Sequence, residues 1–399
     1  MEKPEIRFKG YTDEWEQRKV GEFLTESRES GHKGDVAHKM TVKLWGKGVY
    51  EKNDAGSVNT QYFTRHAGQF IYSKLDFLNC AFGVVPEELE SLETTADVPA
   101  FDCDGVNPHF MFYTAIQPSF YEKNGMIADG SRKAKRIHVD TFLDMPFIVP
   151  SLEEQNKIVN LLSGLDDLLT LHQRKCDEVK SLKKYMLQKM FPQNEQKVPE
   201  IRFEGFTEAW EQRKVTDLGE IYIGLVTTMT EHYTDKGHLL IRNSDIKDGY
   251  FEFGENPIHL DEEFSEQNKS RMHQLGDVIT VHTGDIGTSA VIGENEVNSI
   301  GFATIVTRPN QEILDSNYFA TYLNTDTHKQ WAVSMATGDG RSNYNLKDYT
   351  KLIVPIPEIE EQKKIAACIV NLNTLITLHQ QKCEELKKIK KFMLQKMFV

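Results

Sequence analysis

The chain has 399 residues, a formal net charge of −13 at pH 7, 39% hydrophobic residues and 27% charged residues. This is an ordinary globular composition without a membrane-length apolar run or a signal-peptide pattern, so we expect a cytoplasmic protein. The acidic balance excludes a surface that coats nucleic acid everywhere, although it permits local basic patches. The five cysteines form no CxxC spacing and are expected to stay reduced.

The chain repeats itself at both ends of each half. PEIRFKGYTDEWEQRKV, from Pro4, returns as PEIRFEGFTEAWEQRKV, from Pro199. A longer segment that begins EEQ at Glu153 and ends LQKMF returns from Glu360. Between these ends, roughly over residues 21–146 and 216–352, we find almost no similarity beyond length. The sequence therefore predicts a shared frame that holds two different inserts.

The inserts carry candidate contacts with nucleic acid. The first ends GSRKAKRIHVDTFLDMPFIVP and the second ends GDGRSNYNLKDYTKLIVP, which suggests that loops 130–136 and 338–345 are equivalent. Arginine suits guanine and phosphate, and asparagine suits adenine, although solvated loop ends are the alternative. The candidates are Lys74, Arg132, Lys133, Lys135, Arg136, Arg242, Thr283, Arg341, Asn343 and Asn345.

The second insert also contains a glycine-rich stretch, HTGDIGTS, over residues 282–289. It lacks the lysine of a Walker motif and the spacing of a dinucleotide-binding motif. We therefore expect a tight turn there, within mixed β structure that is punctuated by Gly, Asp and Asn.

The repeated EEQ segments have the apolar spacing of coiled-coil helices. Apolar or semi-apolar positions alternate by four and three, which defines a heptad seam. The seam residues are Leu162, Leu165, Leu169, His172, Cys176 and Val179 in the first copy, and Ile369, Leu372, Ile376, His379, Cys383 and Leu386 in the second. About 39 residues make a rod of roughly 58 Å, which needs a partner along one side.

The other copy is the obvious partner, and chain order makes the pair antiparallel. LQKMF then adjoins a PEIRF start in both halves, so the two termini of the chain are expected to lie close together. The predicted fold is α+β, with two mixed α/β domains separated by a long antiparallel two-helix coiled coil of pseudo-two-fold symmetry. We expect the first domain over residues 1–147, its helix over 148–192, the second domain over 193–352 and its helix over 353–399.

Two helical motifs, HQRKC and HQQKC, raise a metal-binding alternative. Each places a histidine and a cysteine four residues apart on one helix face, and together they could form a Cys2His2 zinc site. We favour a semi-polar layer that fixes the register of the seam, and we assign no metal ligand.

The repeated organisation resembles the specificity subunit of type I restriction-modification systems. The likeness covers essentially the whole chain and is carried by AGQFIYSKLDFLNCAFG from Ala67, LGEIYIGLVTT from Leu218, GDVITVHTGDIGTSAVIG from Gly276, and the helix entries IVPSLEEQNKI and IVPIPEIEEQKKI. The resemblance implies that each insert is a target recognition domain for one half of a bipartite double-stranded DNA sequence. It also implies helices that act as a ruler and dock two modification subunits, which methylate adenine at N6 with S-adenosylmethionine. Restriction subunits would add translocation and cleavage driven by ATP and Mg²⁺.

The chain itself lacks the signatures of those activities. Amino-methyltransferases of this kind need an N/D-P-P-Y/F motif, and none of the 13 prolines is adjacent to another. No Walker motif is present either. We therefore expect a non-catalytic subunit that binds no cofactor and no membrane, with two unlike inserts that read an asymmetric target. The alternative is a coiled-coil scaffold whose inserts bind proteins.

Overall fold

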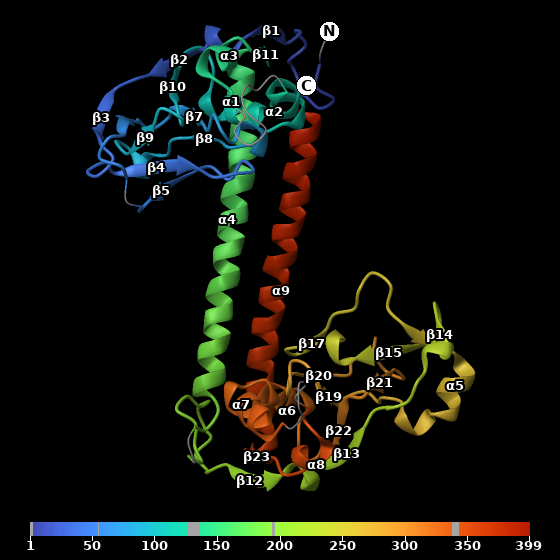
Figure 1. Cartoon of the computed structure of the whole chain (residues 1–399). Coiled ribbons are helices and arrows are strands. Elements are labelled where there is room, and N and C mark those ends of the chain that lie inside the picture. The colour runs from blue at the N-terminus through green and yellow to red at the C-terminus, as the bar shows by residue number, and fades with distance from the viewer. Residues whose placement is uncertain (1–2, 55, 127–135, 194–195, 337–342) are drawn as a thin grey trace. The chain divides into compact units, whose positions relative to one another are not determined.

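The computed structural model describes residues 3–54, 56–126, 136–193, 196–336 and 343–399. The chain forms two compact units: unit 1 comprises Met1–Leu171 with Lys382–Val399, and unit 2 comprises His172–Gln381. Both long helices are shared between the units. Helix α4 (Leu152–Lys189) begins in unit 1 and ends in unit 2, whereas α9 (Ile359–Lys396) begins in unit 2 and ends in unit 1 (Figure 1). Each unit therefore combines a mixed α/β domain with one segment of each helix.

The described residues of unit 1 form three sheets. A two-stranded sheet pairs β1 (Glu16–Lys19) with β11 (Pro146–Val149). A four-stranded sheet has the order β2 (Leu24–Ser27), β10 (Ala100–Cys103), β7 (Phe70–Tyr72) and β8 (Phe82–Val84). A five-stranded sheet has the order β3 (Ser30–Lys33), β6 (Gln61–Thr64), β9 (Glu93–Thr95), β4 (Lys39–Val42) and β5 (Val49–Lys52). The helices are α1 (Pro108–Ala115), α2 (Pro118–Gly125), α3 (Val139–Leu143), and the 3₁₀ turns η1 (Val20–Glu22), η2 (Phe77–Asn79) and η3 (Glu87–Leu89).

Unit 2 is built from the same kinds of element. A two-stranded sheet pairs β12 (Glu211–Lys214) with β23 (Ile353–Ile356), and a four-stranded sheet has the order β13 (Gly219–Ile223), β22 (Ile305–Pro309), β19 (Val278–Thr280) and β20 (Ser289–Val291). Another has the order β14 (Tyr233–Thr234), β18 (His259–Leu260), β15 (His238–Arg242) and β21 (Ile300–Phe302), beside a pair of β16 (Ile246–Lys247) and β17 (Tyr250–Phe251). The helices are α5 (Glu262–Gln267), α6 (Ser316–Leu323), α7 (Asp326–Met335), α8 (Leu346–Tyr349), and the 3₁₀ turns η4 (Val215–Asp217), η5 (Thr230–His232), η6 (Asn243–Asp245) and η7 (Lys269–Arg271).

The two inserts share the strand order of one sheet, which the comparison of their sequences did not reveal. The order β2-β10-β7-β8 in unit 1 corresponds to β13-β22-β19-β20 in unit 2, and both sheets are antiparallel. Among the described strands, each unit also has one parallel pair, β4 with β9 in unit 1 and β15 with β21 in unit 2. The inserts therefore differ in sequence but share this strand order, in keeping with the expected pseudo-two-fold symmetry.

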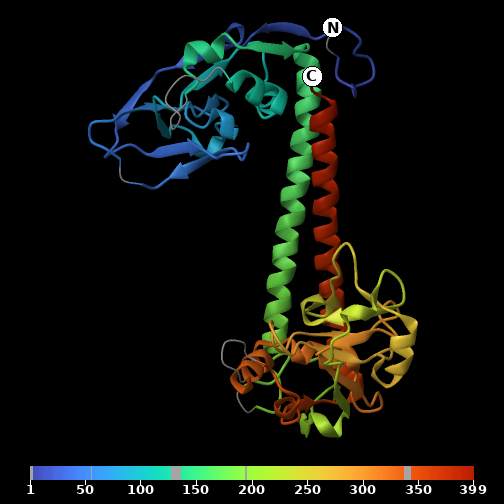
Figure 2. The ribbon, with the colours of Figure 1, turned by 45° about the vertical axis from the view of Figure 1, so that its right-hand side comes forward.

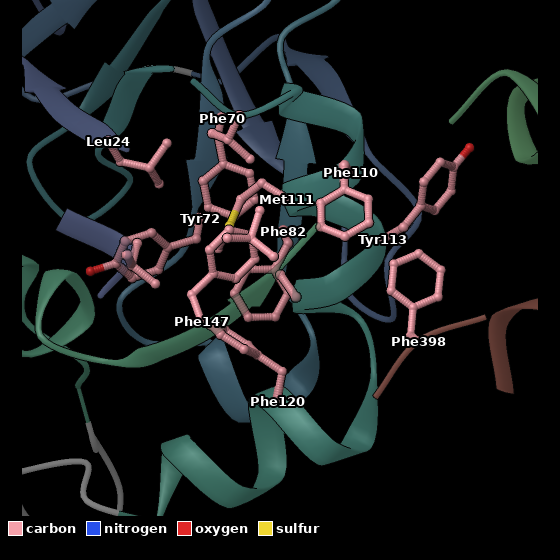
Figure 3. Close-up of a cluster of buried hydrophobic side chains, with 14 of the residues drawn as sticks. Leu24, Phe70, Tyr72, Phe82, Phe110, Met111, Tyr113, Phe120, Phe147 and Phe398 are labelled. Atoms are coloured by element: carbon pink, nitrogen blue, oxygen red, sulfur yellow. The ribbon is translucent and has the colours of Figure 1, made fainter. Parts of the chain in front are cut away.

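The core of unit 1 is rich in aromatic side chains (Figure 3). Phe70, Tyr72 and Phe82 come from the four-stranded sheet, and each is fully buried. Phe398, which follows α9, stacks on Phe110 of α1 with ring centroids 5.5 Å apart. In unit 2, the equivalent Phe191, which follows α4, packs against Trp210. The end of each long helix is therefore anchored in a domain core.

An ion pair attaches each PEIRF segment to a helix entry. In unit 1, Glu154 is 1% exposed and accepts from Arg7 Nε at 2.7 Å and Nη2 at 2.8 Å. Arg202 makes the same two bonds to Glu361 in unit 2. The Glu154 backbone also donates to the Ser151 hydroxyl at 3.4 Å, so Glu154 is held through both its backbone and its carboxylate. The charge of each buried glutamate is thus paired within its own unit.

The glutamine of each EEQ motif is also buried and bonded to the chain. Gln155 accepts from Asn107 N and donates to Pro150 O, whereas Gln362 accepts from Asp315 N and donates to Pro357 O. The EEQ motif therefore fixes the direction in which each helix leaves its domain.

The backbone of PEIRF pairs with the end of a long helix in both units. Ile6 N donates to Lys396 O at 2.9 Å, and Ile201 N donates to Lys189 O at 2.9 Å. These equivalent bonds confirm the expectation that each LQKMF end adjoins a PEIRF start. In unit 1 the bond brings the two termini of the chain together.

Segments of α4 and α9 lie side by side within each unit and run in opposite directions (Figures 1 and 2). In unit 1, Cys383 Sγ contacts Leu169 O and Lys390 pairs with Asp166. In unit 2, Cys176 Sγ contacts Ile376 O and His172 contacts His379. The predicted α+β fold with an antiparallel two-helix coiled coil is confirmed. Among the described residues, no helix is both long and apolar enough to cross a membrane.

Candidate nucleic-acid interface

Each domain has a corner where the chain returns to the end of a central strand. In unit 2, Tyr344 N donates to His282 O at 2.9 Å, two residues beyond β19. In unit 1, Ile137 N donates to Lys74 O at 3.0 Å, two residues beyond the equivalent strand β7. The described ends of the loops that were expected to be equivalent, near 136 and 343, therefore occupy the same place in the fold. We call these two places the strand-end corners.

The strand-end corner of unit 2 brings two predicted contact residues together. Thr283 Oγ1 donates to Asn343 Oδ1 at 2.7 Å, although the residues are 60 positions apart. His282 Nδ1 lies 2.7 Å from the same hydroxyl, and burial lowers the pKa of His282. With its Oδ1 occupied, the amide of Asn343 has its NH₂ group to donate to an outside acceptor. The corner is thus a fixed polar surface that can read the edge of a base.

Arg242 lies at the end of β15 and is held by a buried carboxylate. Asp245 accepts from Arg242 Nη2 at 2.9 Å and from Nε at 3.1 Å, while the arginine side chain is 41% exposed. The hydrogen bond to Asp245 raises the pKa of Arg242. Such a guanidinium is oriented in advance, and its outer edge can contact phosphate or base.

Asn243 connects these elements and was missed in the sequence. Its Oδ1 accepts from His282 N at 2.8 Å, and its Nδ2 donates to Ala303 O at 3.1 Å. The side chain thereby ties the end of β15 to the strand-end corner. The available signal was an asparagine directly after an apolar strand, a common position for a side chain that bonds to backbone.

The strand-end corner of unit 1 carries cations instead. Lys74 N donates to Asp97 O at 2.9 Å, and Arg136 Nε lies 3.6 Å from Asp97 Oδ1. The Arg136 side chain is 40% exposed, so this pair leaves it accessible. Asn345, in unit 2, is the N-cap residue of α8. The remaining candidates, Arg132, Lys133, Lys135 and Arg341, lie outside the described residues.

The glycine-rich stretch forms a tight turn, as expected. Gly284 has φ +107° and Gly287 has φ +84°, values that favour glycine. Gly287 N donates to Val281 O, and the Thr288 hydroxyl donates to Asp285 at 2.6 Å. The turn follows β19, so it sets where His282 and Thr283 lie.

The predicted seam residues line the contact between the helices in each unit. Seven are buried: Leu162, Leu165, Cys176, Ile369, Leu372, Cys383 and Leu386. Five are partly buried: Leu169, His172, Val179, Ile376 and His379.

The histidine and cysteine pairs do not converge on a common point. His172 Nδ1 lies 3.0 Å from His379 Nδ1, whereas Cys176 and Cys383 face backbone carbonyls. Within the described ranges, no group of three or more His, Cys, Asp or Glu side chains could hold a metal ion. The contact between the two histidines fits a polar layer in the seam.

Comparisons with known proteins agree with this organisation. Residues 207–388 match the family model described as the type I restriction modification DNA specificity domain. The type I restriction enzyme MjaVIII specificity subunit of Methanocaldococcus jannaschii is 22% identical over 266 residues, which cover 64% of this chain and 62% of that protein. The putative type I restriction enzyme MjaX specificity subunit of the same organism is 23% identical over 301 residues, 72% of this chain and 66% of that protein. The chain spans less than two thirds of the length of these two relatives.

A solved structure shares the fold. The type I restriction-modification S subunit from M. genitalium superposes with a TM-score of 0.62 at 14% identity, covering 100% of this chain and 99% of that one. The family match, the two relatives and the repeated frame together indicate that this chain is similar to type I restriction-modification specificity subunits.

Proposed function

We propose that the chain is the DNA-recognition subunit of a type I restriction-modification complex, in which each unit reads one half of an asymmetric, two-part DNA sequence. The observation that carries this proposal is the pair of strand-end corners, which have the same place in the fold and different side chains. Unit 1 presents Lys74 and Arg136, whereas unit 2 presents Thr283 and Asn343. A duplicated fold with unlike side chains supports two half-sites of unlike sequence.

The chemistry of each corner fits double-stranded DNA. Lysine and arginine contact phosphate and guanine, whereas the amide of asparagine suits adenine. Arg242 lies near the corner of unit 2, linked to it through the neighbouring Asn243. The net charge of −13 makes tight binding by the isolated chain unfavourable, so we assign full DNA affinity to the complex.

We also propose that the helices dock two modification subunits. Exposed apolar side chains recur at equivalent positions of both helices: Leu168, Leu171, Leu182 and Tyr185 on α4, and Leu375, Leu378, Ile389 and Phe392 on α9. Each of these residues directly precedes a position of the heptad seam. Those positions are Leu169, His172, Lys183 and Met186 on α4, and Ile376, His379, Lys390 and Met393 on α9. Each exposed residue therefore lies about 100° around its helix from the seam.

Because the helices are antiparallel, the exposed rows of α4 and α9 lie on the same side of the pair within each unit. We call this side the apolar face. In unit 1 it consists of Leu168, Leu171, Ile389 and Phe392, and in unit 2 of Leu182, Tyr185, Leu375 and Leu378. Contiguous exposed apolar residues of this kind mark interaction surfaces. Two equivalent faces support two copies of one partner.

The catalytic functions are assigned to the partners. We propose that modification subunits carry S-adenosylmethionine and methylate adenine at N6, and that restriction subunits carry ATP and Mg²⁺. The missing methyltransferase and Walker motifs support a non-catalytic role for this chain. A DNA target also supports a cytoplasmic location.

The DNA-binding proposal is tested with the complex of this chain and its modification subunits. We expect retention on DNA to fall steeply as salt rises, because phosphate contacts release counterions. Sequencing of methylated adenines in a host that carries both subunits should then give an asymmetric two-part motif. Retention without salt dependence, together with unmethylated DNA, would instead favour the protein-binding scaffold, for which the apolar faces are the supporting observation.

The docking proposal is tested separately by native mass spectrometry. Leu378→Asp places a charge on the apolar face of unit 2, where Leu378 is 55% exposed, and should leave one bound modification subunit in place of two. Val370→Asp is the matched control, since Val370 is 43% exposed on the same helix but follows a seam residue and lies on the other side. Two subunits bound to Leu378→Asp would refute docking at this face.

A further inference from the structure

Beside the strand-end corner of unit 2, the chain passes from one sheet to another at Ala303. Strand β21 pairs in parallel with β15, whereas β22, which follows in the chain, belongs to the other four-stranded sheet, β13-β22-β19-β20. Ala303 lies between them with φ +49°, a left-handed value that a residue with a side chain rarely adopts. Such strain persists only where surrounding contacts hold it, and it is concentrated at functional sites.

Contacts on two sides hold this strained residue in place. Ala303 N donates to Leu225 O at 2.9 Å, and Leu225 N donates to Gly301 O at 2.8 Å. On the other side, Asn243 Nδ2 donates to Phe302 O at 3.3 Å and to Ala303 O at 3.1 Å. Because Asn243 Oδ1 also accepts from His282 N, the strained turn is tied to the strand-end corner.

The strained turn presents an aromatic ring beside a cation. Phe302 is 38% exposed and pairs in register with Arg242 on the neighbouring parallel strand. The pair two residues earlier, Leu240 and Ile300, is buried, so this face of the sheet emerges from the core at Phe302 and Arg242. The ring and the guanidinium therefore emerge from the same face.

We propose that Phe302 is an apolar wedge that inserts at a base step of the second half-site, with Arg242 on the adjoining phosphate and Asn243 as the positioning residue. This inference rests on the proposed function and deepens it. Proteins that kink DNA place such side chains between bases and hold the flanking backbone with cations. Phe302 is bordered by Arg242 and is linked through Asn243 to Thr283 and Asn343, the side chains that we assign to the base edges, and this continuity favours DNA as the partner.

The experiment uses the complex with modification subunits and a duplex that carries the motif methylated in the host. 2-Aminopurine replaces in turn each adenine of the second half-site and its flanks, because its fluorescence rises when a base loses its stacking partner. The methylated adenine and its neighbours are left out, since a methyltransferase turns its target base out of the stack. When the wild-type complex binds, we expect the fluorescence of 2-aminopurine to increase at one base step. This mapping needs no variant. If the fluorescence increases at no probed position of the second half-site, the proposal that Phe302 is a wedge is overturned.

Variants then separate the three roles. Phe302→Ala should abolish the fluorescence rise and weaken binding by about tenfold, with the salt slope unchanged, because no phosphate contact is lost. Arg242→Gln should lower the salt slope by about one. Asn243→Asp keeps the oxygen that accepts from His282 N but loses the NH₂ group that donates to Phe302 O and Ala303 O. The increase in fluorescence should therefore be smaller, although Phe302 is still present. Leu275→Ala is the control, since Leu275 is 63% exposed in the same unit and lies outside the turn.

The outcomes distinguish the wedge from the function on which it rests. Wild-type affinity and fluorescence in Phe302→Ala would overturn the wedge and leave DNA recognition standing. Loss of modification subunits from Phe302→Ala, detected by native mass spectrometry, would assign the turn to protein docking and also overturn it. A wild-type complex without salt-dependent binding to the duplex would contradict the proposed function itself.

Discussion

Removal of the buried carboxylate at one helix entry should loosen one PEIRF segment and leave its counterpart unchanged. Glu154→Ala deprives the Arg7 guanidinium of both its bonds, at 2.7 and 2.8 Å. The loss of one partner from a buried ion pair costs about 3–5 kcal/mol. Because the Arg7 side chain is 15% exposed while that of Glu154 is 1% exposed, we expect the lower end of this range, about 3 kcal/mol.

Hydrogen exchange measures this loss locally, which matters because a chain of two units need not unfold in one step. Ile6 N donates to Lys396 O, so its exchange requires opening of the segment. A free-energy change of about 1.4 kcal/mol corresponds to a factor of ten, so a loss of about 3 kcal/mol should accelerate hydrogen exchange over residues 5–12 by about 150-fold. Exchange over residues 200–207 should stay unchanged.

Glu361→Ala provides the mirror experiment, because Arg202 and Glu361 make the equivalent pair in unit 2. It should accelerate exchange over residues 200–207 and spare 5–12. Less than threefold acceleration in either variant, or equal acceleration of both segments, would refute the role of these ion pairs as local clamps.

Three further predictions concern a turn, a titrating group and the chain ends. Gly287→Ala should destabilise unit 2 by about 1–3 kcal/mol in urea unfolding, since φ is +84° and the new Cβ would lie 3.2 Å from His328; an unchanged midpoint would contradict the strain. Hydrogen bonds to Glu90 and then Glu29 raise the pKa of His66 in the folded chain. The stability that protonated His66 contributes is therefore complete at a pH below the pKa of His66 in the unfolded chain, and it is lost as the pH rises through the pKa in the folded chain. An NMR titration of His66 with an ordinary midpoint would disprove this. A permutant opened near Asn194, which lies outside the described residues, with the ends joined by a flexible linker should keep its far-UV CD spectrum and DNA retention, whereas an unfolded permutant would contradict the pairing of the termini.

The helical frame could be predicted from sequence because its signals are local and repeated. A heptad seam specifies which face is buried, and two copies of the seam specify a partner. The contacts that fasten the frame were not predictable in the same way. Arg7 and Glu154 are 147 positions apart, so no local sequence pattern connects them. A surface arginine in PEIRF therefore gave no indication of its buried partner.

The shared strand order of the inserts was not predictable because different side chains fill the equivalent sheets. The equivalent central strands carry Phe70 and Tyr72 in unit 1 but Val278 and Thr280 in unit 2. Strands of three to five residues are defined by hydrogen bonds to distant strands, and such pairings leave little pattern in a short segment. Similarity of topology therefore survives here without similarity of sequence.

The candidate interface was predictable as a set of residues and not as an arrangement. Thr283 and Asn343 were both chosen for their chemistry, yet their hydrogen bond depends on the return of the chain to β19. Asn243 and Phe302 were missed, because one acts through backbone groups of other strands and the other is an isolated aromatic residue in sequence.

The central claim is that each unit reads its own half of the DNA sequence. The most direct test is sequencing of methylated adenines in hosts that carry variant subunits with the modification partner. We predict that Thr283→Ala with Asn343→Ala relaxes or abolishes recognition of one half of the motif, and that Lys74→Ala with Arg136→Ala alters only the other half. Changes that spread over both halves in either variant, or a motif identical to that of the wild type in both, would contradict it.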